Sequence, residues 1–316
     1  MKAQAKPAKL SSSERINYSL RPNKHIERNI VFRALHRLEQ ELHVSDYRYV
    51  GMGSLWFVDF LMAHRLLGIN DMLSVEAHLY ARANANRPLN CIRVAEGFTK
   101  TVLRKESLEK KRAVLWLDYD GPTTADVLED LTYVVGKVPS GSVILATVNA
   151  NPLRDKSKID ALEEALGDLL TESLTPEQMR DGPDGFAGVI ATALTGHLQD
   201  AGQLRSSGRY SPLFNFYYAD GASMVTVGGI IADDATKDAI ARSGVENAPG
   251  VTRTASFTID VPLLTIREKL VLDRFLPATD IKVAAAKEVG VILSADQLEA
   301  YRSLYPYYPM FAEILP

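Results

Sequence analysis

The sequence has almost no cysteine and no recognisable histidine motif. Cys91 is the only cysteine among 316 residues, which excludes an internal disulfide and a site of several thiolates, and favours a reducing compartment. The six histidines form neither a His-x-His nor an HExxH pattern, so we expect no zinc site. A GxSxG motif is also missing, which argues against a serine hydrolase of that type.

Long apolar runs and a strong net charge are missing as well. No apolar run reaches the ~20 residues that span a bilayer, and no apolar core follows the basic N-terminus as in a signal peptide. The formal net charge of -3 gives no overall attraction to nucleic acid or membrane. We therefore expect a cytoplasmic protein without membrane contact, and self-association as a homodimer stays open.

The composition that remains is typical of a globular protein. Hydrophobic residues make up 46% and charged residues 24% of the chain, and the length fits one large domain with appendages. The expected segments are a disordered tail over 1–13, a basic helical segment over 14–45, an α/β domain over 46–262 with a helical insertion at about 153–209, and a C-terminal helical clasp over 263–316.

The stretch from Asp46 to His78 organises the α/β domain. A β-type run, a glycine turn, an apolar helix and a second β-type run follow one another, at Tyr47–Val50, Gly51-Met52-Gly53, Leu55–Leu67 and Met72–Val75. Ser54 can cap the helix and Gly68 can end it. Glu76 follows the second strand, where a carboxylate can accept ribose hydroxyls. This order predicts a βαβ unit that binds a nucleotide.

Further strands follow this unit. They are expected at Cys91–Ala95, Ala113–Leu117, Ser142–Val148 and, as a hairpin, at Leu213–Tyr218 and Met224–Ile231. Apolar strands without alternation are typical of a parallel sheet. We predict an α/β, doubly wound, mostly parallel sheet of seven strands with a terminal antiparallel hairpin and helical appendages at both ends. Its ligand edge would carry the polar residues that end the parallel strands, namely Glu76, Glu96-Gly97-Phe98, Asp118, Asp120 and Asn149.

The N-terminal segment is basic inside an acidic chain. The first 33 residues carry eight Lys and Arg against two Glu. Arg21, Lys24 and Arg28 would share one face of a helix. This face predicts an anionic substrate, either a nucleic acid or a phosphorylated small molecule, and a solvated helix face is the alternative.

The motifs resemble those of the class I S-adenosylmethionine-dependent methyltransferases. The matching pieces are YVGMGS, SVEAH, RVAEGF, LWLDYDG and SVILATVN, followed by the hairpin, over about residues 47–231. The likeness is nearest to bacterial proteins labelled "putative O-methyltransferase". It implies a Rossmann-like fold, S-adenosyl-L-methionine as cofactor and methyl transfer to oxygen. Two positions depart from the family pattern: Tyr49 where an acidic residue is frequent, and Leu55 where a third glycine could fall.

The resemblance also implies the roles of individual residues. The cofactor's methionine part would lie on the turn of Gly51, Met52, Gly53 and Ser54. Its ribose would meet Glu76 and Ala77, and its adenine would meet Glu96, Gly97 and Phe98. Apart from the resemblance, the basic helix face and the end of the fifth strand predict substrate contacts at Arg21, Lys24, Arg28 and Asn149. Asp118 and Asp120 would lie beside the methyl group, and either could be a general base if burial or its neighbour raised its pKa.

Other interpretations stay open. Asp118, Asp120 and Asn149 have the oxygen ligands that magnesium prefers, although no spacing supports such a site and we predict no metal. A nicotinamide-dependent oxidoreductase fits less well, because GMGS lacks the third glycine. A catalytically silent domain that binds a nucleotide or a partner is a third interpretation. Trp56 and Trp116 are expected to be packing residues of the core.

Overall fold

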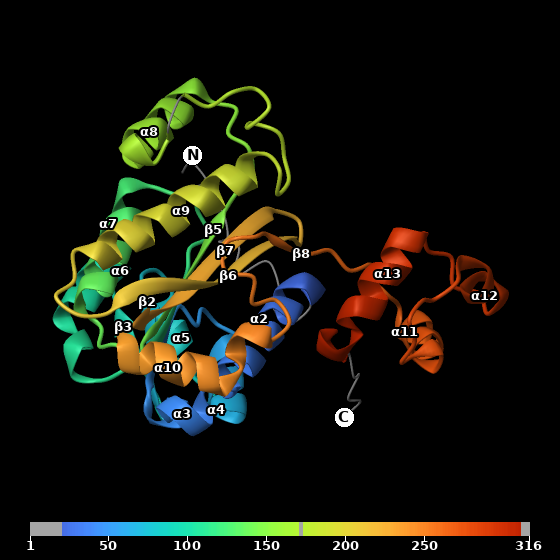
Figure 1. Cartoon of the computed structure of the whole chain (residues 1–316), viewed down its shortest axis with the longest axis horizontal. Coiled ribbons are helices and arrows are strands. Elements are labelled where there is room, and N and C mark those ends of the chain that lie inside the picture. Colours follow the sequence, from blue (N-terminus) through green and yellow to red (C-terminus); the bar gives the residue numbers. More distant parts are fainter. Residues whose placement is uncertain (1–20, 171–172, 311–316) are drawn as a thin grey trace, which may run out of the picture.

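The computed structural model describes residues 21–170 and 173–310 and is built on an eight-stranded sheet. The strand order is β3-β2-β1-β4-β5-β7-β6-β8 (Figure 1). The five parallel strands are β1 (Arg48–Gly51), β2 (Asp71–Glu76), β3 (Ile92–Glu96), β4 (Ala113–Asp118) and β5 (Val143–Asn149). The predicted tail over 1–13 lies outside the described residues.

The other three strands complete one edge of the sheet. β7 (Ser223–Ala232) runs antiparallel to both β5 and β6 (Arg209–Ala219), which forms the predicted hairpin. β8 (Phe257–Ile259) pairs with β6 in the parallel sense. The doubly wound fold is confirmed, and β8 brings the predicted seven strands to eight.

Helices cover both faces of the sheet. One face carries α2 (Pro22–His36), α3 (Glu39–Leu42), α4 (Val58–Leu67), α5 (Tyr80–Asn86) and α10 (Asp234–Ser243). The other carries α6 (Thr99–Val102), α7 (Ala125–Lys137), α8 (Lys156–Leu166) and α9 (Phe186–Gln203). Successive side chains of β4 alternate between the two cores: Val114 and Trp116 pack on the α2 side, and Leu115 and Leu117 on the α7 side.

The helix after the glycine turn begins later than the sequence predicts. α4 starts at Val58, and Ser54 and Phe57 both have a left-handed backbone conformation, with φ of 48° and 49°. Ser54 therefore does not cap the helix. The ring of Phe57 is fully buried, and its burial holds the chain in this turn. The predicted end of the helix at Gly68 is confirmed, with φ of 75°.

Helix α2 is fastened to distant parts of the sheet. The Asn23 Nδ2 donates to the carbonyl of Ala219 at 3.1 Å, and its Oδ1 accepts from the amide of Val261 at 3.0 Å. The backbone amide of Lys24 donates to Asp220 Oδ2 at 2.9 Å. These bonds hold the first turn of α2 against the β6–β7 hairpin and the chain after β8.

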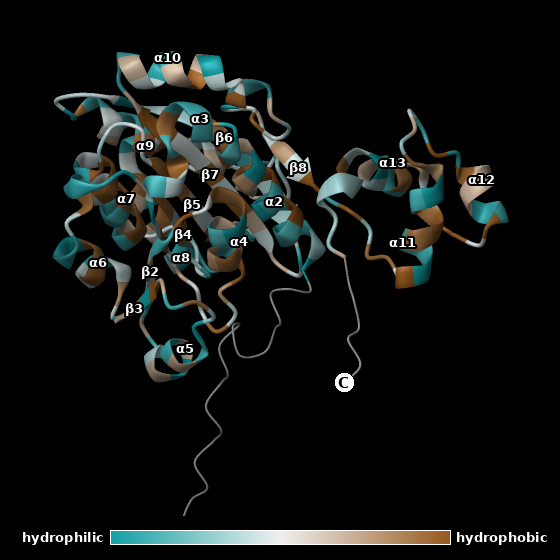
Figure 2. Cartoon of the chain, turned by 90° about the horizontal axis from the view of Figure 1, so that it is seen from below, coloured by the Kyte–Doolittle hydropathy of each residue, from teal (hydrophilic) through white to brown (hydrophobic). Residues whose placement is uncertain are grey.

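The C-terminal helices form a lobe beside the sheet. The lobe holds α11 (Ile266–Leu272), α12 (Val283–Glu288) and α13 (Ala295–Leu304), and both views show it set to one side (Figures 1 and 2). It meets α2 where the Arg33 guanidinium lies 5.3 Å from the centre of the Tyr307 ring. Tyr308 donates its hydroxyl to the carbonyl of Pro262 at 3.0 Å. Within the described residues no helix is both long and apolar enough to cross a membrane.

Candidate active site

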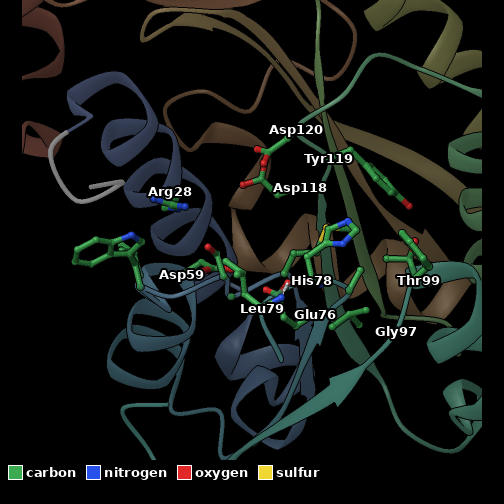
Figure 3. Close-up of a pocket in the computed structure, with 18 residues that line it drawn as sticks. Arg28, Asp59, Glu76, His78, Leu79, Gly97, Thr99, Asp118, Tyr119 and Asp120 are labelled. Carbon is green, nitrogen blue, oxygen red and sulfur yellow. Dashed lines mark hydrogen bonds between the residues drawn. The ribbon is translucent and has the colours of Figure 1, made fainter. Parts of the chain in front are cut away.

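A cavity of about 310 Å³ opens at the carboxyl ends of the central parallel strands. Its walls come from the turns after β1, β2, β3 and β4, together with residues of α2 and α4 (Figure 3). β1 has β2 on one side and β4 on the other, so the connections leave in opposite directions at this point. Such a switch point is where open α/β sheets bind their ligands, and the volume lies in the range of small-molecule sites.

The turn after β1 forms a wall of backbone. Met52, Gly53 and Ser54 line the cavity. A Cβ on Gly53 would come within 2.5 Å of the Phe57 ring, so only glycine fits there. The predicted Gly51 does not line the cavity, because it lies below the turn, where its Cβ position faces Tyr49 and other buried groups.

The carboxylate at the end of β2 is held by the loop that follows it. Glu76 Oε1 accepts from the amides of His78 and Leu79, each at 3.0 Å. These bonds fix the direction of the side chain where it faces the cavity, beside His78 (Figure 3). Ala77 also lines the cavity. A carboxylate held in this way is pre-organised to accept a pair of hydroxyl donors.

The turn after β3 supplies a small and partly aromatic wall. Gly97, Phe98 and Thr99 line the cavity, and Gly97 has φ of 136°, a conformation that favours glycine. The Phe98 side chain is 62% exposed, and its ring forms a T-shaped contact with the His78 ring, with centroids 5.5 Å apart. The predicted Glu96 is exposed and lies outside the lining.

The end of β4 meets the N-terminal helix. Asp118 and Asp120 both line the cavity, and Lys24 of α2 forms an ion pair with Asp118 Oδ2. The Lys24 side chain is only 3% exposed, so this pair lies in the interior. The other oxygen, Asp118 Oδ1, is buried and has no hydrogen-bond partner among the described residues. Asp120 lies at the exposed end of the loop.

Helix α2 also places Arg28 in the cavity wall. Arg28 is 6% exposed, and its Nη1 is buried without a hydrogen-bond partner in the described parts of the chain. Burial acts to lower the pKa of Arg28, but the carboxylates of Asp59 and Asp118 outweigh it and raise that pKa. The predicted basic face is therefore turned inward at Lys24 and Arg28, and the alternative of a solvated face is wrong for these two residues.

Asp59 of α4 completes this side of the cavity. Its Oδ2 accepts from the hydroxyl of Tyr49 at 2.7 Å, and its side chain lines the cavity near Arg28. Burial raises the pKa of Asp59, and Arg28 opposes that rise. Sequence reasoning missed Asp59, although an Asp in the first turn of an apolar helix, ten residues after a tyrosine in a strand, was a visible signal.

Several predicted substrate contacts lie elsewhere. Arg21, Lys24 and Asn149 are not part of the cavity lining. The Asn149 Oδ1 accepts from the amide of Asn151 at 2.9 Å. The Asn149 side chain therefore stabilises the loop after β5. Trp56 is 43% exposed and lines the cavity, so its assignment to the core is wrong, because α4 begins after it.

Metal ligands do not gather at this site. Over residues 21–170 and 173–310, no three His, Cys, Asp or Glu side chains are grouped so that they could hold an ion. The magnesium alternative built on Asp118, Asp120 and Asn149 also loses Asn149, which is outside the cavity.

Comparisons with known proteins give the following matches. The sequence model of a family described as "Putative O-methyltransferase" matches residues 16–316. No curated protein matches the chain. Among solved structures, Trm1 from Pyrococcus horikoshii in complex with S-adenosyl-L-methionine has 10% identity over 69% of this chain and 58% of its own, with a TM-score of 0.46.

Two further solved structures are similar at the same level. The O-methyltransferase from Bacillus cereus, solved with SAH, has 10% identity over 71% of this chain and 93% of its own, with a TM-score of 0.37. A protein described as "Putative hemolysin from Streptococcus thermophilus" has 14% identity over 67% of this chain and 73% of its own, with a TM-score of 0.39.

Proposed function

The chain belongs to the family described as "Putative O-methyltransferase", and on that premise we propose that its cavity binds S-adenosyl-L-methionine and transfers the methyl group to an oxygen of a small-molecule substrate. The observation that carries this proposal is the convergence of Glu76, Gly53 and Asp118 on one cavity, from the ends of three parallel strands. The resemblance in sequence led to these same three residues.

The residues present fit the nucleoside part of this cofactor. Glu76, already fixed by two loop amides, would accept the ribose hydroxyls. Gly97, Phe98 and Thr99 would form the adenine wall, with the exposed Phe98 ring available for contact with a flat base. Gly53 lets the turn pack closely on Phe57 and Ser74, and this packing shapes the wall that the cofactor's chain would meet. Gly51 and Glu96 are not part of the proposed set, since neither lines the cavity.

The chain's own contribution to the reaction is alignment and proton removal. When bound, S-adenosyl-L-methionine supplies a methyl group that is already activated on a sulfonium sulfur. Asp118 is engaged by Lys24 and is therefore held in one position. Asp120 lies at the exposed end of the same loop, so we assign to it the removal of the proton from the substrate hydroxyl. The walls would fix the approach of the oxygen.

The proposed substrate is a small molecule that enters at the open side of the cavity. Asp120 and the half-exposed Trp56 both line the cavity and reach solvent. The exposed basic face that favoured a nucleic acid is absent from this part of α2, because Lys24 and Arg28 are buried. Lys24 and Arg28 therefore give no support to a nucleic-acid substrate.

The test is a calorimetric titration of the protein with S-adenosyl-L-methionine and, separately, with NAD. Glu76→Gln keeps an acceptor for the loop amides but removes the charge, and it should weaken S-adenosyl-L-methionine binding by about 1–3 kcal/mol. The matched control is Glu96→Gln, because Glu96 is the neighbour of Glu76 in the strand register but lies outside the cavity. This control should bind like the wild type.

Each other result has a definite meaning. Unchanged affinity in Glu76→Gln would remove the ribose assignment. Weaker binding in Glu96→Gln would restore the adenine role predicted from the sequence. Binding of NAD alone would favour the oxidoreductase, and binding of neither compound would favour the silent domain.

A further inference from the structure

We propose that Arg28, Asp59 and Asp118 form a clamp for the α-amino-acid end of the bound ligand, with its carboxylate on Arg28 and its ammonium between the two aspartates. The inference rests on the proposed function, because it names the groups that would hold one end of that ligand. It assigns the N-terminal helix α2 to ligand binding.

The first observation is the state of Arg28. Its side chain is more than nine-tenths buried, it lines the cavity, and its Nη1 has no hydrogen-bond partner among the residues that the structure describes. A buried guanidinium N–H without an acceptor is unfavourable, because it has lost its hydrogen bond to water and has not formed another. A carboxylate matches the planar fork of a guanidinium better than any other common ligand group.

The second observation is the pair of carboxylates beside Arg28. Asp59 uses Oδ2 to accept from Tyr49, and Asp118 uses Oδ2 to pair with Lys24. The remaining oxygen of Asp118, Oδ1, is buried and has no hydrogen-bond partner within the described residues. An ammonium group has three donors and no acceptor, so it is suited to a site with carboxylate oxygens on two sides.

The balance of charge around Arg28 favours a ligand end that is neutral overall. The positive charges of Lys24 and Arg28 balance the negative charges of Asp59 and Asp118. Burial raises the pKa of the nearby Glu27 to about 7, which favours the neutral form of this third acid. A zwitterion adds one charge of each sign and keeps this buried balance. A phosphate would add negative charge alone, and an amine would add positive charge alone, at a site where unpaired charge is costly.

The position of the three residues agrees with a ligand that spans the cavity. Arg28 and Asp59 lie on the side of α2 and α4, while Gly97 and Thr99 lie on the opposite side, with Glu76 between them (Figure 3). A nucleoside held by Glu76 would therefore direct its amino-acid end toward the clamp. Tyr49 stands where the family often has an acidic residue. Its hydroxyl donates to Asp59 of α4, so the carboxylate at this place comes from α4 and not from β1.

The test compares two ligands that differ only at the amino-acid end. S-adenosylhomocysteine carries it and 5′-methylthioadenosine lacks it, and calorimetry on the full chain gives the ratio of their dissociation constants. The wild type should bind S-adenosylhomocysteine about tenfold to a hundredfold more tightly, as expected for charged hydrogen bonds. In Arg28→Met this ratio should fall to about threefold or less, because only the binding of S-adenosylhomocysteine weakens.

A control variant and a third ligand sharpen the result. Arg33→Met makes the same change on the exposed side of α2, away from the cavity, and should keep the wild-type ratio. Decarboxylated S-adenosylhomocysteine keeps the ammonium and lacks the carboxylate. The wild type should bind it more weakly than S-adenosylhomocysteine, and Arg28→Met should bind both alike. If Arg28→Met does not fold by circular dichroism, Arg28→Lys keeps the charge without the planar fork and should show an intermediate ratio.

The outcomes separate this inference from the proposed function. Equal binding of S-adenosylhomocysteine and 5′-methylthioadenosine by the wild type would overturn the clamp and leave the proposed function standing. An equal loss for both ligands in Arg28→Met would also overturn it, because Arg28 would then act only on the fold. If the wild type bound neither nucleoside, the proposed function and the clamp would fall together.

Discussion

At the scale of single residues, Glu27 is a buried acid on α2. Both of its carboxylate oxygens are inaccessible and have no hydrogen-bond partner within the described residues. Burial raises its pKa from the ordinary 4.5 to about 7, and the charge of Lys24 opposes that rise. Between these two pH values the folded protein binds more protons at this group than the unfolded chain does. The contribution of Glu27 to stability is therefore complete below about pH 4.5 and is lost as the pH rises through 7.

A glutamine at this position should remove that dependence. Glu27→Gln has nearly the same shape and no titration, so the wild type should lose stability relative to the variant between about pH 5 and pH 8, by up to about 3 kcal/mol. Urea unfolding of both proteins at several pH values measures the difference, and groups common to both cancel. A difference that does not change with pH would show that Glu27 titrates normally.

Residues near one another in sequence were the predictable part of the site. Glu76 and Gly53 follow from the local order of strand, turn and helix, and both line the cavity. The spacing of Lys24 and Arg28 predicts a shared helix face, but not what that face meets. Its partners are aspartates on β4 and α4, and a charge pattern along one helix carries no information about such distant groups.

At the scale of elements, the turn after β1 depends on a glycine. A Cβ on Gly53 would lie 2.5 Å from the Phe57 ring and 2.9 Å from the Ser74 Oγ, and neither group has room to move. Gly136 is different: it lies exposed in α7, and nothing lies within 4 Å of its Cβ position. The two glycines give a matched pair for the same substitution.

Gly53→Ala should lower the free energy of unfolding by about 1–3 kcal/mol, since the crowded turn must shift. It should also weaken S-adenosyl-L-methionine binding. Gly136→Ala should raise the free energy of unfolding by about 0.5–1 kcal/mol, because alanine is the better helix former. Denaturant unfolding of both variants checks the pair. A Gly53→Ala protein as stable as the wild type would show that the turn is looser than its contacts suggest.

The elements themselves were predictable where local signals are strong. The parallel strands, the hairpin and the end of α4 at Gly68 follow from apolar runs and glycines in the sequence. The start of α4 was not predictable in this way, because the burial of the Phe57 side chain overrides the capping preference of Ser54. Helix α10 was not predicted, although Asp233 caps it through the amide of Thr236.

At the scale of the whole molecule, α2 connects the ligand cavity to the β6–β7 hairpin and to the C-terminal lobe. It holds Arg28 in the cavity wall, its first turn is bonded to the β6–β7 hairpin, and its Arg33 packs on Tyr307 of the C-terminal lobe. A sequence pattern cannot place such appendages, because their positions depend on contacts with partners far along the chain. The division into the segments predicted from sequence stays a prediction.

Ligand binding should therefore slow amide hydrogen exchange in α2. In hydrogen exchange with and without S-adenosylhomocysteine, amides of α2 and of residues 52–59 should exchange more slowly when ligand is bound, since both segments line the cavity. The helices α11 and α13 should not change, because they contribute nothing to that lining. Protection of the turn after β1 without protection of α2 would show that the helix does not contact the ligand.

The bonds that fasten α2 reach across most of the polypeptide: Lys24 meets Asp220, 196 residues later, and Asn23 meets Val261, 238 residues later. During synthesis on the ribosome, this helix leaves the exit tunnel long before its partners exist. A nascent chain that stops before the β6–β7 hairpin can form the early parallel strands but lacks the hairpin to which the first turn of α2 is bonded. The helix that carries Arg28 is thus fully anchored only late in synthesis, after the hairpin has formed.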